Sequence, residues 1–479
     1  MKVVLFHSRG YHLNLESRRI NSLACVMPPI GLLSIAAVLR NVGIDVVVLD
    51  GALFADVTNN VWAQKISELK PDYVGFTATT AAFNDVCDVC VKLKELNPTI
   101  FTVFGGVHAS HMSQELIANY QAIDFVIEGE GEQAFLDLIC GVKKETIEGL
   151  FFRLNKTTVR NKPRTTLVNL DDLPFPAYDL LEGFPKKYVM PLFSYKRFPG
   201  VNIVSSRGCI YKCSYCDRSV FGNSFRFNSP AYTIDLMKWL YKDYGVRHFN
   251  FYDDLFTLNR QRVVEFCDKL KKSNLKINYN CIVRIGHINR ELIKALKKSG
   301  CWLISVGIET AEQDLLIKHK NGLSLDKIKS DINLLHDSGL WVKGLFMIGF
   351  PGETEDAIIK TRKFALSLPL KEANLTAFTP FGGAPITKDI DKYGVFNGVS
   401  DDMDCMNFVF VPKEIKEKKI LERNYGLFYK EFYQRLFMFK RVYPRLLLES
   451  PHSFYRILKN LGTFIHFANK ITGSKITGA

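Results

Sequence analysis

The sequence predicts an α/β protein in three parts: an N-terminal doubly wound parallel sheet, a partial (β/α)6 barrel, and a basic, mainly helical C-terminal region. Strand-like runs alternate with helical patterns twice along the 479 residues, a proline-rich stretch separates the two series, and the pattern turns helical and aromatic from Pro412 onward. Alternating strands and helices build parallel sheets. We expect the sheet domain over residues 1–141, a connecting segment over 142–200, the barrel over 201–380 and the helical region over 381–479.

The first series begins directly at the N-terminus. Short runs rich in Val, Ile and Phe predict strands at 2–6, 44–50, 73–78, 100–106 and from residue 125. Helical patterns separate them at 29–43, up to Lys70, up to Leu96 and up to Cys140. In doubly wound sheets, ligands bind beyond the carboxyl ends of the strands.

Small and polar residues follow three of these strands where such a ligand would lie. Glycines there let the backbone approach a large flat ligand, although each could equally form a tight turn. The candidates are Thr77, Thr79, Gly105, Gly106, His108, Gly129, Glu130, Gly131 and Glu132.

The second series has six strand–helix units, fewer than the eight of a closed barrel. Strands are expected at 201–206, 248–254, 277–285, 302–310, 341–350 and 373–378. Helices are expected at 234–244, 260–272, 290–299, 325–338 and 355–368. Functional residues of such barrels lie at the carboxyl ends of the strands.

The apolar runs of the sequence predict neither a membrane-spanning helix nor a signal peptide. The longest apolar run, Leu32 to Leu39, is far shorter than the ~20 residues that cross a bilayer. The N-terminus lacks the apolar core of a signal peptide. We therefore expect a cytoplasmic protein, in which the eleven cysteines are reduced thiols or metal ligands.

Three of those cysteines, Cys209, Cys213 and Cys216, follow the first barrel strand in the stretch RGCIYKCSYCDRS. A structural zinc site requires four protein ligands, usually as two spaced pairs, and no matching second pair exists in the sequence. The pair Cys87 and Cys90 has helical spacing in the other domain and is expected in its core. Cysteine thiolates also hold iron–sulfur clusters, and three of them leave one iron of a [4Fe–4S] cluster open.

The C-x3-C-x2-C spacing, with the aromatic Tyr215 before the last cysteine, resembles the signature of the radical SAM enzymes. The resemblance implies a [4Fe–4S] cluster on the three cysteines and S-adenosyl-L-methionine (SAM) on the open iron. It continues along the barrel, where it implies catalytic roles for Asp254, Glu309 and Arg284. It also implies cofactor contacts for Tyr215, Asp253, Gly307, Gly349 and Gly352.

The N-terminal stretches GFTATT, FGGVHAS and VIEGEGEQAF resemble the Rossmann-like cobalamin-binding domain of the B12-dependent radical SAM subfamily. The resemblance thus covers residues 1 to about 380. One departure concerns the D-x-H-x-x-G motif, whose histidine binds cobalt in some cobalamin domains. None of the ten histidines has an Asp two positions before it, so we expect no cobalt ligand from this motif. His108 and His111 stay weaker candidates for that ligand.

The resemblance also implies a reaction. Reductive cleavage of SAM yields a 5′-deoxyadenosyl radical, which removes hydrogen from an unactivated carbon. Cluster potentials reach about −700 mV, so a flavodoxin or ferredoxin-type reductant is expected. We expect C-methylation of a small-molecule or lipid-like substrate, the commoner outcome in the subfamily. Radical cyclisation, rearrangement or ring contraction without methyl transfer is the alternative.

The net charge of +14 invites a nucleic-acid partner, and tRNA methylthiotransferases also carry a cysteine triad of this kind. Those enzymes have three further cluster cysteines in the N-terminal domain and a C-terminal β-barrel. Here Cys25, Cys87, Cys90 and Cys140 lack that setting and the tail has a helical pattern. A nucleic-acid partner is therefore not expected. A cobalamin sensor that is not an enzyme would have no use for the cysteine triad.

The C-terminal tail is strongly basic, with fourteen Lys and Arg against five Glu from Lys413 to Lys475. Aromatic and apolar residues recur in it at helical spacing: Tyr425, Phe428, Tyr429, Phe432, Tyr433 and Leu436. This pattern predicts a helix whose apolar stripe covers the barrel. A surface helix that contacts anionic lipid or admits a lipid-like substrate is the alternative.

Overall fold

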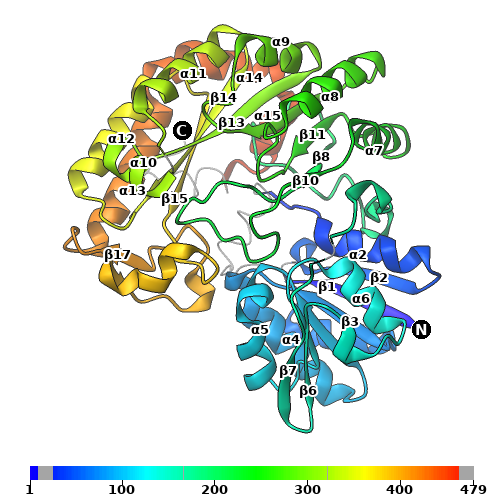
Figure 1. Ribbon diagram of the computed structural model, residues 1–479. Coiled ribbons are helices and arrows are strands. Elements are labelled where there is room, and N and C mark those ends of the chain that lie inside the picture. Colours follow the sequence, from blue (N-terminus) through cyan, green and yellow to red (C-terminus); the bar gives the residue numbers. More distant parts are fainter. Residues whose placement is uncertain (9–24, 55, 166, 321, 463–479) are drawn as a thin grey trace.

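The computed structural model describes residues 1–8, 25–54, 56–165, 167–320 and 322–462. It contains two sheet domains, with the N-terminal sheet and its helices on one side and a curved sheet, ringed by helices, on the other (Figure 1). A hairpin from the second domain reaches between them. The predicted α/β fold class is confirmed.

The N-terminal domain is a seven-stranded sheet in the order β2-β1-β3-β4-β5-β6-β7. The first five strands are parallel, and β6 and β7 are added antiparallel. The strands are β1 (Lys2–His7), β2 (Asp45–Asp50), β3 (Tyr73–Thr77), β4 (Phe101–Gly105), β5 (Phe125–Ile127), β6 (Leu150–Leu154) and β7 (Thr157–Arg160). The sheet thus continues past residue 141, into the predicted connecting segment.

Helices cover both faces of this sheet, so β1 is buried on both sides. Its Val3 and Leu5 join one apolar core, whereas Val4 and Phe6 join the other. Cys87 and Cys90 are buried in that second core, as predicted. The helices are α2 (Ile30–Asn41), α3 (Asn59–Glu68), α4 (Phe83–Leu96), α5 (Val107–Asn119) and α6 (Gly131–Ile139). The sequence pattern did not predict α5, which is kinked at Met112.

The second domain is a six-stranded parallel sheet in the order β15-β14-β13-β12-β11-β8, open at both ends, as the partial barrel requires. Its strands are β8 (Gly200–Ile203), β11 (His248–Phe251), β12 (Asn278–Val283), β13 (Cys301–Glu309), β14 (Trp341–Ile348) and β15 (Glu372–Ala377). The helices are α7 (Pro230–Asp243), α8 (Arg260–Lys272), α9 (Arg290–Lys298), α10 (Gln313–Lys320), α11 (Leu325–Asp337) and α12 (Glu355–Ser367). Only α10 was not predicted.

Tyrosine hydroxyls cover both open edges of the barrel. On α13 (Lys418–Gln434), the Tyr429 and Tyr433 hydroxyls each accept a backbone N–H and donate to a backbone carbonyl of β15. At the other edge the buried Tyr178 hydroxyl donates to the Asn202 carbonyl of β8, 3.0 Å away. Unpaired strand edges invite pairing with other chains, so these contacts protect the open barrel.

The C-terminal region closes the barrel at the amino ends of its strands. Phe428 and Phe432 of α13 are buried against the barrel, as predicted, whereas Leu436 is 63% exposed because α13 ends at Gln434. The Glu449 carboxylate accepts the indole N–H groups of Trp302 and Trp341, which lie at the starts of β13 and β14. This region also contains β16 (Gly394–Phe396), β17 (Phe410–Pro412), the π-helical turn η8 (Met438–Val442), α14 (Tyr443–Glu449) and α15 (Pro451–Lys459).

Candidate functional site

The three cysteines lie on a hairpin loop. Two short antiparallel strands, β9 (Ser206–Arg207) and β10 (Arg226–Phe227), pair at its base and enclose residues 208–225. Gly208 opens the loop with φ +84°, and a Cβ there would come within 2.2 Å of the Ser224 carbonyl oxygen. Only glycine fits this position without moving the backbone. The loop is therefore closed tightly at its base.

The thiols of the loop interact electrostatically. Burial, together with the charges of the neighbouring Cys213 and Cys209, raises the pKa of Cys216 to about 12. Burial also raises the pKa of Cys209, whereas a hydrogen bond from the Tyr211 backbone opposes this shift. Within the described part of the chain, no three His, Cys, Asp or Glu side chains form a ready metal site. The donor chemistry of the three thiols nevertheless suits a cluster, whose binding removes their protons.

His319, at the end of α10, supports the cluster loop. Its Nδ1 is hydrogen-bonded to the Ser214 hydroxyl at 2.8 Å, and its carbonyl accepts the Ser214 N–H at 3.1 Å. Next to Ser214, the ring of Tyr215 meets Phe350 edge-on at 5.4 Å. The loop is thus fixed from β14 and α10, at the carboxyl ends of the barrel strands.

Glu309 and Arg284 meet at Lys320, the residue after His319. The buried Lys320 ammonium donates to Glu309 Oε1 and to the Gly307 carbonyl, both at 2.6 Å. Glu309 has φ +68°, and a Cβ on Gly307 would come within 2.5 Å of its carboxylate. The Arg284 guanidinium donates to the Lys320 carbonyl and lies 3.7 Å from the Tyr211 ring centre. Strained backbone of this kind is common at functional sites.

Asp253 and Asp254 have different environments. Asp253 is 1% exposed; its oxygens accept hydrogen bonds from Ser205 N–H and from the hydroxyls of Ser205 and Ser206, each at 2.7 Å. Asp254 is exposed, and its Oδ2 accepts the Gly208 N–H at 2.8 Å. Asp253 thus supports the strand that leads into the hairpin, whereas Asp254 lies free to contact a ligand. Direct contact of Asp253 with SAM stays a prediction.

The glycine-rich turn after β14 is built around Glu353. Gly349 and Gly352 have φ +88° and +86°, and the Glu353 Oε2 accepts the N–H groups of Gly349 and Phe350. Glu353 is 0% exposed, and its Oε1 has no hydrogen-bond partner among the residues that the structure describes. Burial raises the pKa of this carboxyl group to about 8, although both backbone N–H groups oppose the shift.

This raised pKa predicts how stability depends on pH. Between pH 4.5 and 8 the unfolded chain ionises Glu353 while the folded chain keeps it protonated, so the contribution of Glu353 to stability falls as pH rises. In Glu353→Gln the side chain still accepts both N–H groups but cannot ionise. The melting temperature of Glu353→Gln relative to the wild type should therefore rise by on the order of 5 °C from pH 5 to pH 8. A difference that stays constant over this range would contradict the assignment.

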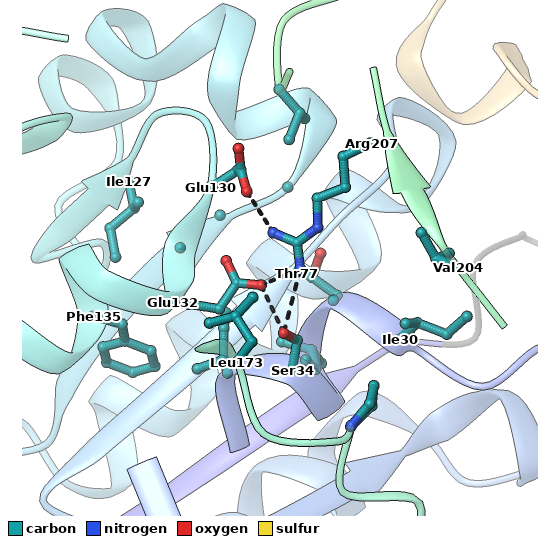
Figure 2. A pocket seen from close by; sticks show the side chains of 18 of the residues that line it. Ile30, Ser34, Thr77, Ile127, Glu130, Glu132, Phe135, Leu173, Val204 and Arg207 are labelled. Carbon is teal, nitrogen blue, oxygen red and sulfur yellow. Dashed lines mark hydrogen bonds and ion pairs between the residues drawn. The ribbon is translucent and has the colours of Figure 1, made fainter. Parts of the chain in front are cut away.

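A cavity of about 220 Å³ lies between the two domains, at the carboxyl edge of the N-terminal sheet (Figure 2). The N-terminal domain contributes seven of the predicted cofactor contacts to its lining: Thr77, Gly105, Gly106, Gly129, Glu130, Gly131 and Glu132. The second domain contributes Val204, Arg207, Val220, Phe221, Asn228, Tyr232 and Leu236. Gly106 has φ +92°, and a Cβ there would meet Thr77 Oγ1 at 2.6 Å. The cavity fits an arm of a large cofactor that lies across the sheet edge.

Charged side chains close one side of this cavity (Figure 2). Arg207 forms ion pairs with Glu130 and Glu132, and the Ser34 hydroxyl donates to Glu132 at 2.7 Å. Burial opposes the charge of Arg207, yet Glu132 and Glu130 raise its pKa above that of a free arginine. Burial would raise the pKa of Glu132, but Arg207 holds it below the usual value. Both groups are therefore charged.

Thr79 and His108 lie outside the cavity lining. His108 is buried, with its Nδ1 3.2 Å from the Thr80 hydroxyl and its ring 4.4 Å from that of Phe83. Burial and the neighbouring His111 lower the pKa of His108 to about 4, so it is neutral near pH 7. A cobalt ligand from His108 or His111 stays a prediction.

No local sequence pattern predicted the supporting residues His319 and Lys320, or the ion pairs of Glu130 and Glu132 with Arg207 and Arg226. The only signal for these residues is that their charged side chains are buried. Such charges stand out only once their burial is known.

Comparison with known proteins places two family models on this architecture. A B12 binding domain model matches residues 19–139, and a Radical SAM superfamily model matches residues 203–365. The first match lies on the N-terminal sheet and the second on the barrel.

Relatives match over most of the chain. An uncharacterized methyltransferase of Pyrococcus horikoshii is 31% identical over 84% of this chain and 88% of its own length. An anaerobic magnesium-protoporphyrin IX monomethyl ester cyclase of Rubrivivax gelatinosus is 28% identical over 84% of this chain and 74% of its own. The solved radical SAM methyltransferase TsrM of Kitasatospora setae, with cobalamin and a [4Fe–4S] cluster bound, has a TM-score of 0.66 and 18% identity. The match covers 82% of this chain and 74% of the TsrM chain, so the two proteins share the fold.

Proposed function

This chain belongs to the radical SAM enzymes that carry a B12-binding domain, and we propose that it methylates an unactivated carbon of a small-molecule or lipid-like substrate. Its cofactors are a [4Fe–4S] cluster, SAM and cobalamin. The observation that carries the proposal is the hairpin at residues 206–227. Its loop bears the three cysteines, and its base lines the cavity of the B12-binding domain.

The residues described above have separate tasks. Cys209, Cys213 and Cys216 would hold the cluster, and the cavity beside Gly106 and Glu132 would hold part of cobalamin. When bound, the cluster supplies the electron that cleaves SAM, and cobalamin supplies a methyl carrier.

Polar groups at the carboxyl ends of the barrel strands would bind and orient SAM. Lys320 fixes the carboxylate of Glu309, and Arg284 is fixed by its bond to the Lys320 carbonyl. The exposed Asp254 carboxylate accepts a hydrogen bond from Gly208 at the start of the cluster loop. We assign to these three groups the contacts with the charged methionine part of SAM. A flavodoxin or ferredoxin-type protein is the proposed reductant.

The function is tested with SAM whose methyl group carries deuterium. Cell extract from a strain lacking the gene is incubated with reduced, reconstituted protein, and the metabolites are compared by mass spectrometry. Methylation predicts a metabolite that gains three deuterium atoms with the wild type and not with Cys213→Ala. A new product without deuterium would instead support cyclisation, as the relation to the cyclase would suggest.

We also propose that the last described helices contact a membrane surface. From Phe432 to the C-terminus the chain has eight Lys and Arg and one acidic residue. Several apolar side chains there are exposed, among them Phe439, Leu448 at 84% and Leu458 at 70%. Basic charge beside apolar side chains suits anionic lipid. Because Glu449 ties these helices to the amino ends of β13 and β14, away from the cluster loop, we assign them to anchoring and not to substrate entry.

The contact that we propose is peripheral. No helix of the described residues has the length and apolar character to span a bilayer. We expect vesicles rich in phosphatidylglycerol to bind the protein, and binding to weaken when salt rises from 0.15 to about 0.5 M. The double variant Leu448→Asp/Leu458→Asp should bind about tenfold more weakly, since two apolar contacts are lost. Leu96→Asp, at a 52% exposed site of the other domain, is the control and should bind like the wild type. Equal binding by all three proteins would refute the assignment.

A further inference from the structure

Glu130 of the B12-binding domain binds both strands at the base of the cluster hairpin. Arg207 and Arg226 face each other in the β9–β10 ladder, and each forms an ion pair with the Glu130 carboxylate, one with each oxygen. Arg207 also pairs with Glu132 at 2.6 Å. One carboxylate from the first domain therefore spans the two strands that enclose the cysteines.

The charges at this point depend on one another. Two guanidinium groups on directly opposed residues repel, and opposed like charges destabilise a strand pair. All four side chains are at most 18% exposed, so solvent and salt screen them weakly. Glu130 and Glu132 balance the two arginines. Without Glu130, the hairpin base would keep two cations beside a single anion.

Three of these residues, Glu130, Glu132 and Arg207, line the cavity assigned to cobalamin. Glu130 and Arg207 both contribute to its wall, from different domains, and Gly129 lies against the loop, where a Cβ would be 3.5 Å from the Val220 carbonyl oxygen. The backbone leaves the hairpin base at Gly208 and reaches Cys209 at the next position. A ligand that fills the cavity therefore contacts residues that also hold the base of the cysteine loop.

We propose that Glu130 is a positioning residue that couples cobalamin binding to the geometry of the cluster loop through Arg207 and Arg226. Cobalamin in the cavity favours the arrangement in which Glu130 holds both strands, and a formed cluster favours the same arrangement. Coupling of two sites is reciprocal, so each cofactor should strengthen binding of the other. This inference rests on the proposed cofactors and adds a link between them.

The test measures the dissociation constant of hydroxocobalamin by equilibrium dialysis, on the full chain, before and after anaerobic reconstitution of the cluster. In the wild type the cluster should tighten cobalamin binding about tenfold, within the range usual for coupled sites. In Glu130→Gln, which cannot balance both arginines, the two constants should differ by less than about twofold. Electron paramagnetic resonance of the reduced cluster should change on cobalamin addition in the wild type and stay unchanged in Glu130→Gln.

Glu128→Gln is the matched control. It removes a carboxylate two positions away whose ion-pair partner, Arg160, belongs to the same domain, so the tenfold coupling should persist. Arg207→Lys keeps the positive charge but cannot bridge both carboxylates. This variant replaces Glu130→Gln in the test if Glu130→Gln does not fold. Its coupling should fall below about threefold. Equal dissociation constants in the wild type, or full coupling in the folded variants, would overturn the inference. A chain that binds no cobalamin in either state would instead refute the cofactor assignment.

Discussion

Alanine in place of Cys209, Cys213 or Cys216 should reduce SAM cleavage to background. Each change leaves two thiolates, too few to retain a [4Fe–4S] cluster with one open iron. The wild type, reconstituted anaerobically, should contain about four irons and four sulfides per chain, and each variant much less. The readout is 5′-deoxyadenosine formed under reducing conditions, measured by chromatography together with iron content.

Cys140→Ala is the control for loss of a thiol. Cys140 is exposed and lies in the N-terminal domain, so its replacement should leave iron content and SAM cleavage unchanged. If any of the three cysteine variants formed 5′-deoxyadenosine at the normal rate, the assignment of the cluster to this loop would be wrong.

Asp253→Ala should destabilise the protein by about 3–5 kcal/mol, because it removes the ion-pair partner of the buried Arg262. Arg262 is 5% exposed, its Nη1 lies 4.0 Å from Asp253 Oδ2, and its Nη2 donates to the Ser205 carbonyl. Burial lowers the pKa of Arg262, while the charge of Asp253 opposes this shift. The loss also removes the acceptor for Ser205 and Ser206 at the start of the hairpin. Urea unfolding of the barrel measures the change.

The neighbouring Asp254→Ala separates stability from function. Asp254 is exposed and accepts a backbone hydrogen bond from Gly208, so its loss should cost about 1 kcal/mol. The same change should weaken SAM binding, since we assign Asp254 to SAM. If Asp253→Ala proved as stable as Asp254→Ala, the structural role that we assign to Asp253 would be refuted.

The parts of the fold that depend on local pattern could be predicted from sequence. The six barrel strands were predicted because each is a run of β-branched and aromatic residues between helical patterns, and the cysteine motif is local in sequence. α10 was not predicted, because its eight residues have little amphipathic pattern. His319 and Lys320 lie on this helix and were therefore not predicted either, although they hold the cluster loop and Glu309.

Contacts between distant parts of the chain could not be predicted from one sequence. Glu130 was a candidate because it follows a strand in a glycine-rich turn, but its partners Arg207 and Arg226 lie 77 and 96 positions away. Asp253 and Asp254 are neighbours in the sequence, yet in the turn after β11 Asp253 is buried and Asp254 is exposed. Burial of this kind follows from tertiary packing and not from residue type.

The measurement that tests the central claim most directly is the ratio of the two products of SAM during turnover with the true substrate. A methylase of this family uses one SAM as methyl donor and another as radical source, so S-adenosylhomocysteine and 5′-deoxyadenosine should accumulate in similar amounts. Both should be quantified in the same reaction, with Cys213→Ala as the blank. Formation of 5′-deoxyadenosine with S-adenosylhomocysteine at background would contradict methylation and leave cyclisation or rearrangement as the reaction.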